Sequence, residues 1–493
     1  MGVRTLAFDR ARDVYDKPRA FALDHEIMRV FQDLGLAGGI APHTAPFTAS
    51  EYYGAAGQLI KRLGSVPPPY PLGWPPNMVF TQPPVEAALR KHAGEYPSVE
   101  IELGSELLDF RQASDHVTLR LRGEDGRERE TSARYLVGCD GASSTVRQRA
   151  GIVFEDLDFD EPWLVVDLLV NERGLAKLPA VSIQYCEPAR PCTYLIGPGA
   201  HRRWEIMLLP GEERTKMETE AEVWRLLSRW LNPAEATLWR VASYRFHALV
   251  ARTWRDRRVF IAGDAAHQQP PFTGQGMCQG VRDVANLSWK LRLVLEGKAD
   301  DGLLDSYAAE RGQHVRQLTT TIKDIGRLIC ERDPQAAALR DRRLLDEAGG
   351  EIRTVPRQQL IPSLGRGFLS PLAHPANGSI FPQPRVKREG GVVLMDDVAG
   401  SGFRVVVRED FPLEQIQRMD LVQRPMRVLR MGTGKGCLTE TEGVVAGWFG
   451  KYGCGAALVR PDHYVYGVAR SAAELDRQLE AMTAALQGKK ELT

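Results

Sequence analysis

The 493-residue sequence lacks the marks of several protein classes. Its seven cysteines are odd in number, scattered, and never spaced C-x-x-C, which argues against a disulfide framework and against a zinc cluster. Lysine and arginine together number 64 against 63 aspartates and glutamates, so no surplus of one charge points to nucleic acid or to a membrane surface. Partners must therefore be inferred from specific sites.

Targeting signals are also scarce. No apolar run approaches the roughly 20 residues that span a bilayer, and the first residues lack the apolar core of a secretory signal. Met1-Gly2 could suggest myristoylation, but Leu6 stands where serine or threonine is needed. We expect a cytoplasmic protein with no metal site, no membrane anchor and no nucleic-acid partner.

The length and the apolar patterns indicate several domains, because 493 residues exceed the usual size of one core. The apolar run 3–8 predicts a buried parallel strand, and apolar residues at three- and four-residue steps predict a helix over 24–34. Residues 161–250 are mostly strand-like and residues 275–348 mostly helical. This order predicts an α/β (α+β multi-domain) protein with an antiparallel sheet inserted into its α/β part.

The last quarter of the chain predicts a separate small domain. Residues 361–388 are rich in proline and glycine and are typical of a linker. About 100 residues of mixed strand and helix patterns follow, and the glycine run 432–436 among them is interpreted as a loop. The predicted elements are strands at 391–396, 403–408, 426–430 and 456–460 and helices at 413–419 and 471–487.

The strongest functional signal is the run from Arg258 to Gly276, which continues through Asp283 and Asn286. An apolar strand ends at Asp264, and in α/β sheets ligands bind at the carboxyl ends of strands. The glycines that follow let the main chain approach a flat ligand where a Cβ would clash. Gly276 should start a helix whose free N–H groups stabilise negative charge on that ligand.

A second run, Leu136 to Arg147, repeats the pattern of a strand that ends in an acid and a glycine. Its Asp140-Gly141 turn precedes Ser143 and Ser144, either of which could cap the next helix. Alone this run is a moderate signal. Together with the first run it indicates one ligand site at two neighbouring strand ends.

The two runs resemble the Asp-Gly and Gly-Asp motifs of the flavoprotein aromatic hydroxylases related to para-hydroxybenzoate and phenol hydroxylases. Further segments resemble the 3-(3-hydroxyphenyl)propionate hydroxylases in particular, and the similarity covers nearly the whole chain. These segments are 15–20, 80–83, 202–212, 447–449 and 459–462. The resemblance implies a Rossmann-like FAD-binding domain, an inserted antiparallel β substrate domain and a C-terminal thioredoxin-like domain without C-x-x-C. The corresponding boundaries are 1–150 and 253–360 for FAD binding, 151–252 for substrate, 361–388 for the linker and 389–493 for the last domain.

The resemblance also implies roles for residues. Asp9 matches the acid that binds the adenosine ribose, Gln82 and Asp264 match ribityl contacts, and Asp140 lies near the cofactor. The full set of expected FAD-binding residues is Asp9, Arg10, Arg19, Gln82, Asp140, Gly263, Asp264, Pro271, Gly274, Gln275 and Gly276.

The implied activity is a monooxygenase that hydroxylates a phenolic aromatic acid such as 3-(3-hydroxyphenyl)propionate in the breakdown of aromatic compounds. It uses FAD, NADH or NADPH, and O2, through a C4a-hydroperoxyflavin. Two alternatives remain open, a polyketide-tailoring hydroxylase and a truncated, inactive homologue with an interaction role. A homodimer is possible.

No catalytic base is assigned. His43, Tyr185 and His247 are candidates for deprotonating or orienting the phenol, although a packing or surface role is favoured for each, and His267 is expected to support the site from behind. The family's opening strand and its G-x-G-x-x-G turn are not found. We therefore expect roughly 25 to 35 residues of a βαβ unit in front of Met1.

Overall fold

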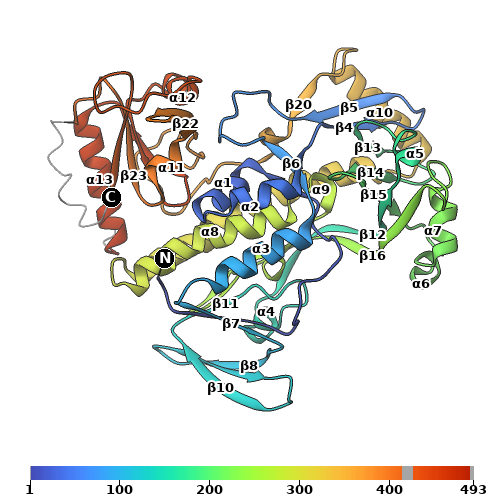
Figure 1. Cartoon of the computed structure of the whole chain (residues 1–493), viewed down its shortest axis with the longest axis horizontal. Coiled ribbons are helices and arrows are strands. Elements are labelled where there is room, and N and C mark those ends of the chain that lie inside the picture. The colour runs from blue at the N-terminus through green and yellow to red at the C-terminus, as the bar shows by residue number, and fades with distance from the viewer. Residues whose placement is uncertain (1, 414–425, 489–493) are drawn as a thin grey trace.

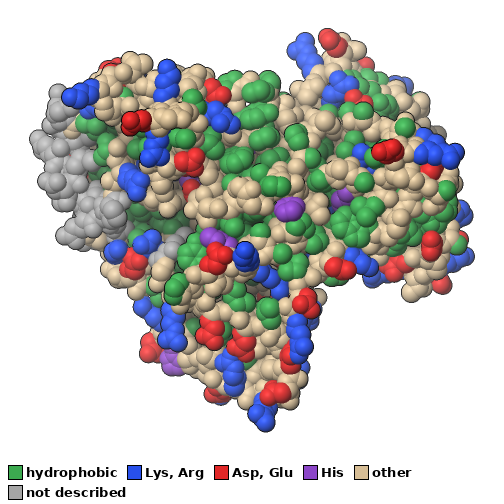
Figure 2. Space-filling view, viewed as in Figure 1, with side chains coloured by type: hydrophobic (Ala, Val, Ile, Leu, Met, Phe, Trp, Pro, Cys, Tyr) green, Lys and Arg blue, Asp and Glu red, His purple; other side chains and the backbone are tan. Residues whose placement is uncertain are grey.

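The computed structural model describes residues 2–413 and 426–488 (Figure 1). It has a mixed α/β fold with one large sheet, several small ones and a separate C-terminal unit. Lysine, arginine, aspartate and glutamate side chains are intermixed over the face shown in Figure 2. Within the described ranges, no helix combines the length and the apolar character needed to cross a bilayer.

Two pairs of parallel strands form the α/β part. β1 (Thr5–Asp9) pairs with β7 (Val99–Leu103), and β11 (Leu136–Gly138) pairs with β18 (Val259–Ile261) in a separate sheet that β17 (Arg255–Asp256) completes. The predicted parallel strand near residue 3 is confirmed, but its burial was wrong. Thr5, Ala7 and Asp9 are exposed, and only alternate residues pack on the core, because β1 lies at the edge of a two-stranded sheet.

The large sheet has nine strands and is mainly antiparallel, with parallel pairing only at β13–β4 and β5–β20. It joins strands from distant parts of the chain. In sheet order they are β19 (His267–Gln268), β16 (Ala236–Ala251), β12 (Phe154–Val170), β15 (His201–Met207), β14 (Cys192–Ile196), β13 (Ser182–Tyr185), β4 (Ala49–Tyr53), β5 (Leu59–Gly64) and β20 (Thr354–Pro356).

Alternation along β12 gives this sheet two buried faces. Trp163 and Val165 pack with Phe272 and with α9 (Asp305–Ile329), whereas Leu164 and Val166 pack under α7 (Glu220–Leu227). Period-two alternation places successive side chains on opposite faces, so each face has its own core. Only the face toward α9 adjoins the Arg258–Gly276 run. A smaller antiparallel sheet of β8 (Glu106–Gln112), β9 (Val117–Arg122) and β10 (Glu128–Ala133) lies apart from it.

The predicted helix at 24–34 and the predicted helical region 275–348 are confirmed, with sharper limits. α1 (His25–Asp33) begins where the Asp24 carboxylate accepts from the N–H groups of Glu26 and Ile27. The helical region 275–348 is divided into α8 (Gly276–Leu295), α9 and α10 (Pro334–Glu347). α8 runs through the middle of the molecule beside α1, and α3 (Gln82–Gly94) lies below it in Figure 1.

The C-terminal unit holds a four-stranded sheet covered by helices. The predicted strands and the last helix are confirmed, whereas one strand and two helices were missed and most of the predicted helix 413–419 falls outside the described residues. The confirmed elements are β22 (Gly391–Leu394), β23 (Arg404–Arg408), β24 (Arg427–Met431), β25 (Ala456–Val459) and α13 (Ala472–Leu486). The missed elements are β26 (Val465–Ala469), α11 (Met395–Ala399) and α12 (Val444–Tyr452).

Buried charges fasten this unit to the α/β part. Arg29 of α1 pairs with Asp396, which also binds Arg404, and all three side chains are almost completely buried. Arg460 pairs with Glu310 of α9 (2.7 Å). These contacts replace water around each charge with a partner of opposite sign, so the unit is held in one orientation.

Candidate functional site

Two strand ends and the start of one helix border an open hollow of about 290 Å³. Register pairing sets Gly138 beside Ile261, so the turns that follow β11 and β18 open at the same edge. The lining residues are Cys139, Gly141, Ala262, Gly263, Asp264, Gly276, Met277, Gly280, Val281 and Val284. The two sequence runs singled out above therefore meet at one site, at the carboxyl ends of parallel strands.

Glycines bring α8 against the strand end. A Cβ added at Gly280 would lie 3.3 Å from the Gly263 Cα, and Gly263 has a positive φ of +59°. A Cβ at Gly276 would instead meet nothing within 4 Å, because it would point into open space at the start of the helix. No side chain caps α8, so its first N–H groups remain available to an anionic ligand edge.

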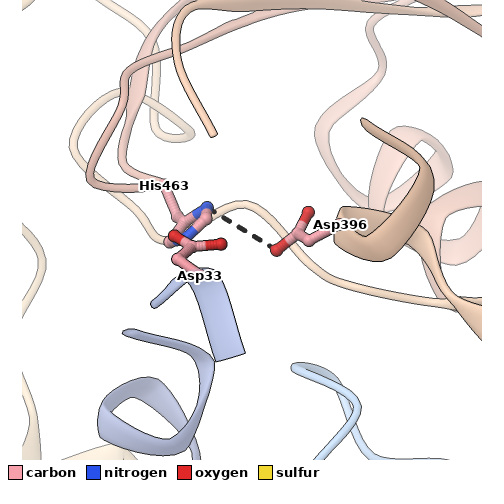
Figure 3. A group of neighbouring side chains, drawn as sticks. All are labelled: Asp33, Asp396 and His463. Atoms are coloured by element: carbon pink, nitrogen blue, oxygen red, sulfur yellow. Dashed lines mark hydrogen bonds and ion pairs between the residues drawn. The ribbon is translucent and has the colours of Figure 1, made fainter. Parts of the chain in front are cut away.

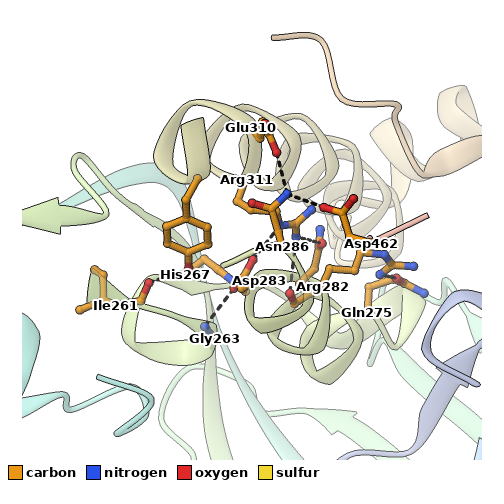
Figure 4. Close-up of polar contacts among 12 residues, drawn as sticks. Ile261, Gly263, His267, Gln275, Arg282, Asp283, Asn286, Glu310, Arg311 and Asp462 are labelled. Atoms are coloured by element: carbon orange, nitrogen blue, oxygen red, sulfur yellow. Dashed lines mark hydrogen bonds and ion pairs between the residues drawn. The ribbon is translucent and has the colours of Figure 1, made fainter. Parts of the chain in front are cut away.

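A buried carboxylate holds the Gly263 turn from behind (Figure 4). Asp283 accepts from the Gly263 N–H (3.0 Å), from His267 Nε2 (2.7 Å) and from Arg311 Nε (2.8 Å). Burial alone would raise the pKa of Asp283, but His267 and Arg311 outweigh it and hold the pKa below its usual value. The turn that presents Asp264 is thus fixed by an ionised, fully paired group.

Gln275, just before α8, is held in the same way. Its Oε1 accepts from Arg282 Nη1 (3.0 Å), and Arg282 Nε donates to Glu26 of α1 (2.6 Å). The hydroxyl of Tyr464, in the C-terminal unit, donates to the other oxygen of Glu26 (2.8 Å). The start of α8 is therefore positioned by α1 and by the C-terminal unit together.

Asp264 lines the hollow and is partly open to solvent. The surrounding protein partly desolvates its carboxyl and raises its pKa, although the nearby charges of His267 and Arg19 oppose this rise. The electrostatic influence of Arg19 shows that this predicted residue lies near Asp264. A carboxylate here can accept a hydrogen bond from a polyol ligand.

The other predicted residues lie along one side of α3. Gln82 Oε1 accepts from the N–H groups of Arg19 (3.0 Å) and Ala20 (2.6 Å). Glu86, one turn on, lies 3.9 Å from Arg19, and Arg90 links Glu86 (2.9 Å) to Asp9 (3.6 Å). This polar stripe runs from the end of β1 toward the hollow, as an extended ligand requires. Arg10 is exposed beside it.

Asp140 has a structural task. Its carboxylate accepts from the Ser144 hydroxyl (2.5 Å) and from the Val146 N–H (3.0 Å), while Ser144 caps α4 (Thr145–Arg149). The neighbours Cys139 and Gly141, rather than Asp140, line the hollow. Of the two serines considered, Ser144 is the cap.

Aromatic side chains brace the turn that leads into α8. Phe272, in the short helix Pro271–Thr273, lies 5.6 Å from Trp163 and 6.0 Å from Phe246, measured between ring centroids. Gly274 ends this turn with φ +66°, and a Cβ there would lie 2.6 Å from the Ala22 Cβ. An apolar, aromatic cluster on the face of the large sheet toward α9 thus packs behind the turn that leads into α8.

The candidates for a proton-handling role lie in different places. Tyr185 packs in the core on the far face of the sheet, under α7, and burial raises its pKa. His247 lies 3.4 Å from Asp160 on β16, and the carbonyl of His43 accepts from Thr81. His267 is buried, with Nε2 engaged by Asp283, which is the supporting position expected for it.

Asp33, Asp396 and His463 form a group that a metal ion could in principle use (Figure 3). The Asp396 carboxylate is already bound by Arg29 and Arg404, and His463 Nδ1 accepts from Arg404 (2.6 Å) while Nε2 faces Asp33 (2.6 Å). Two guanidinium charges oppose a third cation at this point. The group joins α1 to the C-terminal unit.

Sequence reasoning missed Arg282, Arg311 and Glu26, the charged residues behind the hollow. A signal existed, because Gln279, Arg282, Asp283 and Asn286 recur at helical spacing and so share one side of α8. Four polar side chains on one side ordinarily indicate a solvated face, and only the packing of α1 and α9 buries them.

Comparisons with known proteins match nearly the whole chain to flavin-dependent hydroxylases and monooxygenases. A family model described as FAD binding domain matches residues 1–321, and another, described as HcaD C-terminal domain, matches residues 378–485. The chain is 36% identical to a probable NADH-specific resorcinol 4-hydroxylase of Rhodococcus jostii, over 98% of this chain and 91% of that protein. It is 32% identical to a 3-(3-hydroxy-phenyl)propionate/3-hydroxycinnamic acid hydroxylase of a Mycobacterium species, over 99% and 89%. Among solved structures, the flavin-dependent monooxygenase PieE, in complex with FAD and substrate, aligns with a TM-score of 0.83 at 22% identity over 99% and 95%.

Proposed function

The chain belongs to the FAD-binding family of aromatic hydroxylases, and from this premise we propose that it hydroxylates a small phenol beside the hollow at the start of α8. It is an FAD-dependent monooxygenase. NADH as the electron donor is proposed because a relative named as a probable NADH-specific hydroxylase matches nearly the full chain. The observation that carries the proposal is the hollow itself, which joins both predicted motifs to an uncapped helix start.

The residues present fit the flavin. Gly276 leaves room for a flat ring system that a side chain there would obstruct, and the first N–H groups of α8 face this space. Gly263 and Gly280 let α8 pack closely on the strand end. Asp264 would accept from a ribityl hydroxyl, while Arg19, Gln82 and Asp9 follow the line toward the ribose. When bound, FAD takes hydride from the nicotinamide and activates O2 for transfer of one oxygen atom to the ring.

The protein's own part is to hold the cofactor, to orient the phenol and to exclude water. Asp283 and Arg282 fix the two turns that border the hollow, so the groups that face the cofactor are preorganised. We propose that the phenol ring lies, away from water, against the cluster of Trp163, Phe246 and Phe272, the aromatic wall, which is buried behind the turn into α8. We assign no catalytic base.

Replacing Asp264 by alanine should weaken FAD binding by about 1.5 to 3 kcal/mol, the scale of a hydrogen bond to a charged group. Fluorescence titration of the FAD-depleted protein with FAD measures the change. Asp300→Ala, on a distant surface turn where Asp300 only caps a short helix, serves as the control and should leave the affinity unchanged. Equal FAD affinity in wild type and Asp264→Ala would exclude Asp264 as a ribityl ligand.

The activity is tested with purified, FAD-loaded protein. NADH oxidation should rise when 3-(3-hydroxyphenyl)propionate or resorcinol is added, and mass spectrometry should show a product heavier by one oxygen atom, labelled from ¹⁸O2. Stimulated NADH oxidation without product would indicate an effector rather than a substrate. If no phenol stimulates the loaded protein, the proposed function is wrong.

A further inference from the structure

Among the described residues, one buried arginine has neither a hydrogen bond nor an ion pair. Arg357 follows β20 directly and is 9% exposed, yet no hydrogen bond and no carboxylate partner of its guanidinium is found among residues 2–413 and 426–488. Every other arginine with so little exposure in this part of the chain has a hydrogen bond or an ion pair. Burial lowers the pKa of Arg357, as expected for a charge that lacks compensation.

The surroundings of Arg357 present polar groups that also lack partners. The guanidinium lies over the ring of Phe47, 4.5 Å from its centroid. Tyr52 on β4 is 1% exposed, and its hydroxyl has no hydrogen-bond partner. Burial raises the pKa of Tyr52, and the positive charge of Arg357 opposes this rise. Both amide atoms of the adjacent Gln358 are buried without partners as well.

These groups lie where the large sheet approaches α8. Tyr52 packs in the same core cluster as Trp163, Phe246 and Phe272, the aromatic wall behind the turn into α8. On the other side, the charge of Arg357 interacts with Cys278, the third residue of α8. A ligand that reached Arg357 would therefore have its apolar part against the aromatic wall and one end at the guanidinium.

A carboxylate satisfies this set of groups. The guanidinium offers parallel N–H donors that match the two oxygens of a carboxylate, and a tyrosine hydroxyl can add a third hydrogen bond. A buried cation without a partner destabilises the free protein. An anion that binds there offsets this cost, and the offset adds to the anion's affinity. A neutral dihydroxybenzene would leave the charge uncompensated.

We propose that Arg357 and Tyr52 bind the carboxylate of an aromatic acid whose ring lies against the aromatic wall. The proposal rests on the proposed function and narrows its substrate class to phenols that carry an acidic side chain. Such a site would favour 3-(3-hydroxyphenyl)propionate, the acid in the name of the Mycobacterium relative, over resorcinol, the compound in the name of the Rhodococcus relative.

The test separates binding from turnover. Isothermal calorimetry on the full-length, FAD-loaded protein uses 3-phenylpropionate and its neutral analogue 3-phenylpropanol, neither of which carries a phenol hydroxyl. Arg357→Met should weaken 3-phenylpropionate about ten- to a hundredfold and leave 3-phenylpropanol unchanged. Tyr52→Phe should weaken only the acid, by about three- to tenfold. Arg342→Met, which removes the same charge from the exposed side of α10, is the matched control and should change neither affinity.

Each outcome decides between the two ideas. If Arg357→Met binds the acid as wild type does, or loses acid and alcohol equally, the carboxylate site is wrong. If the acid depends on Arg357 while no phenol stimulates NADH oxidation, the site stands and the proposed activity fails. Should Arg357→Met not fold, wild type alone decides, because the acid must bind at least tenfold more tightly than the alcohol.

Discussion

Replacing Glu310 by glutamine should lower the free energy of unfolding by about 3 to 5 kcal/mol, the scale for breaking a buried ion pair. Glu310 is fully buried and accepts from Arg460 Nη2 (2.7 Å), Lys290 Nζ (2.8 Å) and Asn286 Nδ2 (2.6 Å). Glutamine keeps the shape but not the charge. Arg460 would retain Asp462, whereas Lys290 would lose its only ion-pair partner among the described residues.

Urea unfolding of the full-length protein measures this change. The control is Glu347→Gln, at an exposed pair with Arg343, which should cost less than about 0.5 kcal/mol. A loss in Glu310→Gln no larger than in the control would show that the buried pair adds no stability.

The pH dependence gives an independent check. Burial would raise the pKa of Glu310, but Arg460 and Lys290 lower it from 4.5 to about 2. Because the folded pKa lies below the unfolded one, the contribution of Glu310 is present above about pH 4.5 and is lost as the pH falls toward 2. The stability gap between wild type and Glu310→Gln should therefore narrow below pH 4.5, and a constant gap would contradict the assigned ionisation.

Replacing Gly274 by valine should abolish FAD binding and lower the free energy of unfolding by about 2 to 5 kcal/mol. The left-handed φ of +66° costs a β-branched residue about 1 to 2 kcal/mol, and overlap with the Ala22 Cβ adds about 1 to 3 kcal/mol. The turn that delivers α8 to the hollow would be displaced. The flavin absorbance of the purified variant and its urea unfolding measure both effects.

Gly276→Ala is the matched control, two residues away. Its Cβ would touch no protein atom, so the FAD-free protein should be as stable as wild type or slightly more so, because alanine is the better helix former. FAD affinity alone should fall, since the new methyl group points into the hollow. If Gly276→Ala binds FAD normally, the cofactor does not lie against the start of α8.

The elements that position the hollow could be predicted because their signals are local. The apolar run before Asp264 and the glycines up to Gly276 determine a strand, a turn and a helix start with little help from elsewhere. α1 followed from its apolar periodicity. β1 was wrongly expected to be buried, because apolar composition does not reveal whether a strand has neighbours on both sides.

The charged residues could not be predicted from spacing. Nothing in the sequence distinguishes Glu310, Arg460 and Asp396 from solvated surface charges. Only contacts between distant parts of the chain bury them and pair them. Arg357 is the opposite case, since its significance is the lack of a partner in the folded protein. No sequence pattern states that a charge will remain uncompensated.

The order of strands in the large sheet has a consequence for biosynthesis. β5 is made early, but its neighbour β20 lies roughly 290 residues later, so the ribosome needs about 15 to 60 s to supply it. Until then β5 has a free edge, and a chain still being made exposes it to chaperones and to other nascent chains. Arg357 is made directly after β20. A chain that has reached only β18 can already pair β11 with β18, but it still lacks the arginine of the proposed carboxylate site.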